Sequence, residues 1–155
     1  MKYLKFALLI SLSLLFTACA STTIGKIKGK ASYKEYEGAY AKCGNSKEEQ
    51  YLQKQINHYL KEEQIYGNEL KIECNIKYYD EGNRIFRHFA PTGAMGVGAA
   101  KSKIKIILKN RFGFSIASFE SSSEMKMGFL GGDAKGVLDE SAKEITSYIK
   151  KSYIR

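Results

Sequence analysis

The sequence has few of the residue types on which metal centres and catalytic pairs depend. Its 155 residues include one proline, no tryptophan, two histidines and three cysteines. Because a metal site needs three or four clustered ligands, this supply predicts neither a metal nor a cofactor. His58 and His88 also stand apart from any serine or cysteine in a nucleophile spacing, so we expect a protein that is not an enzyme.

A long hydrophobic run is also missing. The uncharged apolar stretch Phe6 to Phe16 is eleven residues long and follows Lys2 and Lys5. A bilayer core about 30 Å thick needs about twenty apolar residues in a helix, so this stretch is too short for a finished membrane span. It fits the hydrophobic part of a signal peptide, and residues 1–18 are therefore set aside from the fold.

The next residues predict how the protein is attached. Leu15 to Cys19 reads Leu-Phe-Thr-Ala-Cys, which resembles the lipobox of bacterial lipoproteins. The resemblance implies cleavage before Cys19, acylation of that cysteine with chains such as palmitate, and anchoring in a membrane; a simple signal peptide is the alternative. The following residue is Ala20 rather than aspartate. By resemblance to enterobacterial lipoproteins, this implies sorting to the outer membrane, facing the periplasm.

Acidic residues are the scarcer charged class. There are 25 Lys and Arg against 16 Asp and Glu, and the loss of Lys2 and Lys5 with the signal peptide leaves 23 minus 16, about +7. An exported protein rarely meets nucleic acid, so we expect no nucleic-acid partner. The charge suits an anionic membrane surface, an acidic polysaccharide or an acidic protein partner; the alternative is a set of lysines spread over solvated faces.

Cys43 and Cys74 remain as a pair once Cys19 carries lipid. In an oxidising compartment an even pair favours a disulfide, with two free thiols as the alternative. A bond that closes a loop of this length would stabilise the fold by about 3–4 kcal/mol in the chain-entropy model.

The chain divides into a tether and one domain. Residues 19–35 are small, polar and basic, and they predict a flexible tether, although Ile24 and Ile27 would allow a short edge strand. The remaining residues, 36–155, are enough for a single domain and hardly for two.

Apolar periodicity predicts two helices in this domain. Ser46 and Glu49 form a capping-box pattern at the start of a helix over residues 46–65. A second helix is predicted behind Asp133, whose side chain would cap it, and it ends in basic residues as the helix dipole favours.

Strands are predicted between the helices. Residues 70–79 and 101–109 alternate apolar and polar side chains, residues 85–89 and 114–119 resemble strands, and Asn110 to Gly113 forms a turn. The fold class is therefore α+β: an antiparallel sheet of three to five strands with two helices packed on one face, in the order helix, strands, helix. The other face would be polar and rich in lysine.

A glycine-rich block interrupts the strands. Gly93, Gly96 and Gly98 follow Pro91 and lead into a strand, whereas the glycines of nucleotide-binding loops lead into a helix. The block therefore predicts a flexible connection or bulge, or a mobile loop that inserts into a partner or a membrane.

Two arginines stand just before this block. Arg84 and Arg87 precede Pro91 and are candidates for an anion-binding site. Together with Gly93, Gly96 and Gly98 they are the candidate binding residues of the chain.

The spacing of these residues resembles a bacterial lipoprotein family that is classified as a domain of unknown function, number forty-four ten. The resemblance covers about residues 36–153 and supports a lipoprotein with an α+β fold; it implies no catalytic residue. The matching residues are Arg84, Arg87, Pro91, Gly93, Gly96, Gly98, Gly113, Phe119, Gly128, Gly131 and Gly132.

The sequence leaves three functions open. The first is a non-enzymatic, lipid-anchored accessory or structural subunit of the cell envelope that acts through contacts with an envelope protein. The second is a periplasmic binder of an anionic glycan or small anion, through Arg84 or Arg87 and the lysine-rich face. The third is a hydrolase of an envelope polymer.

Overall fold

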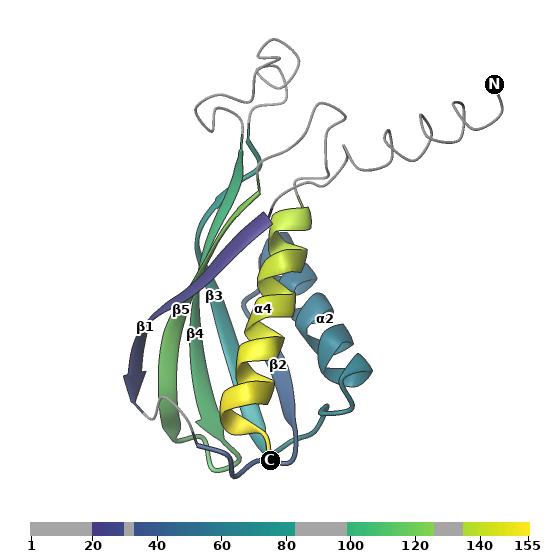
Figure 1. The fold of residues 1–155 in the computed structure, drawn as a ribbon, viewed down its shortest axis with the longest axis vertical. Helices are drawn as coiled ribbons and strands as arrows, with labels where there is room; N and C mark the ends of the chain where they lie inside the picture. The colour runs from purple at the N-terminus through teal and green to yellow at the C-terminus, as the bar shows by residue number, and fades with distance from the viewer. Residues whose placement is uncertain (1–19, 30–32, 83–98, 126–134) are drawn as a thin grey trace, which may run out of the picture.

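The computed structural model describes residues 20–29, 33–82, 99–125 and 135–155. These ranges form five strands and two helices in one layered unit (Figure 1). In chain order the elements are β1 (Ala20–Gly29), β2 (Ala39–Cys43), α2 (Lys47–Glu62), β3 (Leu70–Asp80), β4 (Ala100–Asn110), β5 (Ser115–Met125) and α4 (Gly136–Tyr153).

The strands form one sheet in the order β1-β5-β4-β3-β2, and α2 and α4 lie together over one of its faces (Figure 1). The predicted α+β class is thus confirmed, with two helices in the described ranges. The predicted antiparallel sheet is wrong, because β2 runs parallel to β3 and the sheet is mixed. The predicted helix-first order is also wrong, since β1 and β2 precede α2.

Strand β1 occupies much of the segment that was predicted as a tether. It pairs antiparallel with β5 from Ala20 opposite Met125 to Gly29 opposite Ala117. The pairing is irregular between Gly25 and Lys28, where Lys26 adopts a left-handed φ of 51°. The sequence allowed only a short edge strand here, because its small and polar residues alternate weakly.

The core lies between the helices and the inner face of the sheet. Alternate residues of β3 and β4 are buried, as the predicted period of two requires, and Phe119 of β5 joins them. Leu52, Ile56 and Leu60 of α2 recur at helical spacing and are fully buried. Because most apolar side chains fill this one layer, the opposite face of the sheet carries mainly polar residues, with Ile107 of β4 as an exception.

The two helices are joined by a polar contact. The hydroxyl of Tyr59 on α2 donates a 2.9 Å hydrogen bond to Oδ2 of Asp139 on α4. Burial, and then this bond to a carboxylate, raise the pKa of Tyr59 to about 12, so the hydroxyl remains a donor at neutral pH.

The start of α2 confirms the predicted capping box. Oγ of Ser46 accepts from the amide of Glu49 at 3.1 Å, and the Glu49 carboxylate accepts from the amide of Ser46 at 3.3 Å. Helix α4 begins at Gly136. Asp133, its predicted cap, lies outside the described residues.

Small hydroxyl side chains line the end of the core where α4 approaches the sheet. Ser141 on α4 is hydrogen-bonded to Ser102 on β4 at 3.0 Å and to Ser123 on β5 at 2.7 Å. Ser123 in turn meets Thr22 of β1 at 2.7 Å. These bonds satisfy buried hydroxyl groups and fix the position of α4 relative to three strands.

The β4–β5 connection is the predicted tight turn. The side chain of Asn110 accepts from the backbone amides of Phe112 and Phe114, both at 3.0 Å. Gly113 has a φ of +85°, a conformation that a side chain at this position would disfavour. The predicted strand over residues 85–89 lies outside the described residues. In the ranges that are described, neither helix has the length and apolar character to cross a bilayer.

Candidate anion-binding face of the sheet

Most of the predicted site residues lie outside the described residues. This group contains the predicted acylation site Cys19, His88 and the five candidate binding residues Arg84, Arg87, Gly93, Gly96 and Gly98. Their proposed roles therefore stay predictions. The site that the structure does describe is the face of the sheet opposite the helices, which we call the open face.

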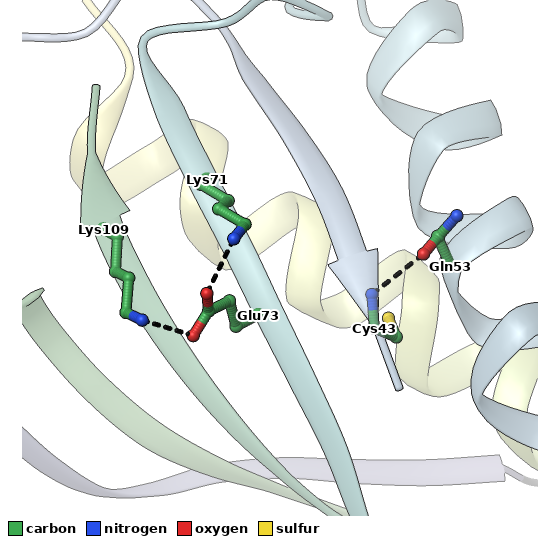
Figure 2. Close-up of polar contacts among 5 residues, drawn as sticks. All are labelled: Cys43, Gln53, Lys71, Glu73 and Lys109. Atoms are coloured by element: carbon green, nitrogen blue, oxygen red, sulfur yellow. Dashed lines mark hydrogen bonds and ion pairs between the residues drawn. The ribbon is translucent and has the colours of Figure 1, made fainter. Parts of the chain in front are cut away.

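The predicted disulfide joins the edge strand β2 to β3 on the core side of the sheet. Cys43 ends β2 and is bonded to Cys74 on β3, with their Cα atoms 4.5 Å apart. The two residues are direct partners in the parallel register of β2 and β3, which brings their side chains together. The amide of Cys43 also donates a 2.9 Å hydrogen bond to Oε1 of Gln53 on α2 (Figure 2).

Lysines outnumber carboxylates on the open face. They alternate with buried residues along β4 and occupy corresponding positions on the other strands. The lysines of the open face are Lys26, Lys28, Lys42, Lys71, Lys77, Lys101, Lys103, Lys105 and Lys109; its carboxylates are Glu73, Asp80, Glu120 and Glu124.

Glu73 is held between two of these lysines (Figure 2). Its Oε1 lies 2.8 Å from Nζ of Lys71, and its Oε2 lies 2.8 Å from Nζ of Lys109 on the neighbouring strand. The hydrogen bond from Lys109, followed by that from Lys71, holds the pKa of Glu73 below its usual value, and the bond to Glu73 raises the pKa of Lys71. The carboxylate is therefore ionised and its charge is compensated on both sides.

Glu120 on β5 has a similar position. Its Oε2 is 3.2 Å from Nζ of Lys26 and 3.6 Å from Nζ of Lys103. The hydrogen bond from Lys26 is the main cause that lowers the pKa of Glu120. Glu124 pairs with Lys101 at 3.7 Å. Glu73, Glu120 and Glu124 are thus engaged with lysines, whereas the fourth carboxylate, Asp80, accepts from the Tyr78 hydroxyl and the Gly82 amide.

Four lysines of the open face have no carboxylate partner within 4.0 Å among the described residues: Lys28, Lys42, Lys77 and Lys105. They line two hollows. One, of about 310 Å³, lies over β2, β3 and β4 and contains Lys42 and Lys105. The other, of about 340 Å³, contains Lys28, Lys77 and Lys105. Lys105 is common to both hollows, and each hollow also contains one lysine-paired carboxylate, Glu73 in the first and Glu120 in the second.

This arrangement suits an extended or branched anion. Separate ammonium groups can each approach a different negative group of the ligand. With strands about 4.8 Å apart, Lys77 lies one strand from Lys105, and Lys28 and Lys42 each lie two strands from it. In the described ranges no three potential ligands gather for a metal ion. His58 lies on α2, half-exposed and 3.3 Å from Glu62, so it takes no part in the open face.

Sequence patterns identified only part of this surface. The alternation of lysines over residues 101–109 correctly predicted a lysine-rich face. Lys42 was missed because β2 was not predicted, and Lys28 because its segment was interpreted as a tether. The alternation over residues 70–79 placed Lys77 correctly on the polar side, but it failed for Tyr78, which is exposed and pairs with Lys103 because the register shifts between Ile76 and Tyr78.

Comparison with known proteins gives a fold likeness and no family assignment. No protein-family model matches the chain, and no curated protein sequence matches it. A solved PelC dodecamer from Paraburkholderia phytofirmans is similar in structure, with 6% identity and a TM-score of 0.50. The likeness covers 87% of this chain and 99% of the PelC chain. At this identity it shows a shared fold only.

Two further solved structures are less similar. A second PelC dodecamer from the same organism, a single-substitution variant, has 6% identity and a TM-score of 0.48, over 81% of this chain and 98% of its own. A "putative lipoprotein" from Caulobacter crescentus CB15 has 11% identity and a TM-score of 0.45, over 73% and 88%.

Proposed function

We propose that the chain is a non-enzymatic, lipid-anchored protein of the cell envelope whose open face binds an anionic envelope polymer. The observation that carries this proposal is the group of unpaired lysines, Lys28, Lys42, Lys77 and Lys105, which lines two hollows that share Lys105 on one side of the sheet. Three of the four carboxylates of the same face, Glu73, Glu120 and Glu124, are paired with other lysines, and Asp80 accepts from Tyr78 and Gly82.

The anchor is the second part of the proposal. The lipobox-like residues support acylation of Cys19, and Cys19 directly precedes Ala20, where β1 begins. Since consecutive Cα atoms are 3.8 Å apart, the acylated residue is continuous with the edge strand of the sheet. The domain would then sit close to its membrane, within reach of polymers at the periplasmic surface; the outer membrane is the proposed location.

A protein assembly is the second candidate function. The PelC chain of similar fold is described as a dodecamer, which motivates an accessory subunit that acts through contacts with an envelope protein. An acidic protein surface would use the same lysines as an anionic polymer, but it would bind with a defined stoichiometry rather than along a repeating chain.

The proposal is tested with the full chain extracted in mild detergent and two probes of equal length, dextran sulfate and neutral dextran. We expect binding to dextran sulfate only, which weakens with salt and falls several-fold in the double variant Lys42→Gln with Lys105→Gln. The matched control, Lys54→Gln with Lys143→Gln, removes the same charge from the helices and should bind as the parent does. Equal loss in both variants would contradict a specific face.

A further inference from the structure

The two edges of the sheet differ in whether they can pair with another strand, and the β2 edge cannot. On β2 the outward amides of Ala39, Ala41 and Cys43 have partners, and so do the carbonyls of Ala39 and Ala41. The amide of Ala39 donates to the carbonyl of Ile65 at 2.8 Å, and the carbonyl of Ala39 accepts from Gly67 at 2.9 Å. The loop after α2 therefore occupies the start of this edge.

Side chains of α2 close the rest of the β2 edge. Oδ1 of Asn57 accepts from the amide of Ala41 at 2.8 Å, and Nδ2 of Asn57 donates to the carbonyl of Ala41 at 3.1 Å. Gln53 accepts from the amide of Cys43 at 2.9 Å (Figure 2). A helix thus supplies the hydrogen bonds of a missing strand, so no other chain can extend the sheet on this side.

Strand β1 forms the opposite edge (Figure 1). Every second residue of an antiparallel edge strand directs its amide and carbonyl away from the sheet. In the described ranges no backbone or side-chain group is bonded to the outer side of β1. The first six residues, Ala20–Gly25, carry no charge and include two threonines and an isoleucine, residues that pair well between strands.

The distribution of charge along β1 favours antiparallel pairing with a second copy of the same strand. Lysines occur only in its second half, at Lys26 and Lys28, after the irregular pairing begins. Parallel alignment with a second copy would place lysine beside lysine. Antiparallel alignment of Ala20–Gly25 with the same segment of a second copy instead pairs uncharged residues with each other and leaves the lysines beyond the overlap.

We infer that the outer edge of β1 is a self-association site, at which two copies pair antiparallel through Ala20–Gly25. The two copies would be related by a two-fold axis perpendicular to the sheet. When this axis passes beside Thr22 or Thr23, each residue that points toward the core lies opposite a residue of the other copy that also points toward the core. The product is a continuous ten-stranded sheet, with the helices of both copies on one face and both open faces on the other. This inference does not depend on what the open face binds.

The test is the mass of the full chain in mild detergent, with charge placed at the proposed contact. Thr23 is exposed and faces Ser122 of β5 in register. Thr23→Lys would bring two added cations together at the axis, and we expect the protein mass to fall from two chains to one. Thr23→Val keeps the strand propensity without the charge and should stay dimeric. Ser122→Lys adds the same charge one strand further in and should also stay dimeric.

Cross-linking locates the contact independently. Copies that carry Thr23→Cys should be joined efficiently by a short bismaleimide. With the axis beside either Thr22 or Thr23, the two thiols lie within about two residues of each other along the paired strands. Copies that carry Ser122→Cys are separated by three strand spacings, about 14 Å, and should be joined much less. A monomeric parent chain, or a dimer that Thr23→Lys leaves intact and that Thr23→Cys does not cross-link, would overturn the inference.

Discussion

Asn57 of α2 bonds both backbone groups of Ala41 on β2, accepting from its amide at 2.8 Å and donating to its carbonyl at 3.1 Å. A single side chain thus replaces one residue of a neighbouring strand. Because Ala41 is buried, both backbone groups would otherwise lack water as well as a strand partner. The contact joins the helix layer to the sheet through hydrogen bonds in addition to apolar packing.

Asn57→Leu should therefore destabilise the fold. The substitution leaves the amide and carbonyl of Ala41 without partners, and we expect the free energy of unfolding to fall by about 1–3 kcal/mol. Urea unfolding measures this loss. Lys54→Leu lies on an exposed position of the same helix and should change stability little; equal losses for the two variants would contradict the role of Asn57.

The disulfide between Cys43 and Cys74 should contribute a large share of the stability. It closes a loop of 31 residues, for which the chain-entropy model gives about 3–4 kcal/mol. We expect Cys43→Ala with Cys74→Ala to lower the free energy of unfolding by this amount. Reduction of the parent protein should add two hydrogens to its mass, and labelling of both cysteines without reductant would refute the bond.

Glu73 gives a pH dependence of known sign. Its folded pKa lies below the reference value of 4.5 because Lys109 and Lys71 donate hydrogen bonds to it. Its stabilising contribution is therefore complete above pH 4.5 and is lost as the pH falls through the lowered folded pKa.

A substitution isolates this contribution. At neutral pH Glu73→Gln should be less stable than the parent by up to about 1 kcal/mol, since the ion pairs are partly exposed. The difference should shrink as the pH is lowered toward 2 and also in about 1 M salt. Glu144→Gln, at a position with no ion pair in the described ranges, is the control. A constant difference at every pH would contradict the assignment.

The anchor prediction concerns Cys19. Because the thiol is the site of the proposed acylation, Cys19→Ser should release the protein from membranes and remove the lipid from its mass. Cell fractionation and intact-protein mass spectrometry measure the two effects. Ser21→Ala, two residues away, should remain membrane-bound; a lipid-carrying, membrane-bound Cys19→Ser protein would disprove the anchor.

The elements with strong periodicity could be predicted from the sequence. Leu52, Ile56 and Leu60 recur on one helical face, and the lysines of residues 101–109 alternate with buried residues. Both patterns are local, and burial of one face produces them directly. The Ser46–Glu49 capping box is local too, so its residues identify the helix start without any knowledge of the fold.

The two edge strands could not be predicted in the same way. Strand β2 has five residues, and its hydrogen bonds come from β3 on one side and from Asn57 and Gln53 on the other. Those partners are set by tertiary packing, which overrides the weak local pattern. Strand β1 depends likewise on β5. The sequence therefore predicted the open face only in part, because Lys28 and Lys42 belong to these edge strands.

The most direct test of the anion-binding account is lysine footprinting of the full chain, by acylation and mass spectrometry, with and without bound dextran sulfate. The account predicts that the polymer protects Lys28, Lys42, Lys77 and Lys105, with the strongest protection at Lys105, while Lys54 and Lys143 on the helices react at unchanged rates. Equal protection of all lysines, or protection confined to the helices, would contradict it.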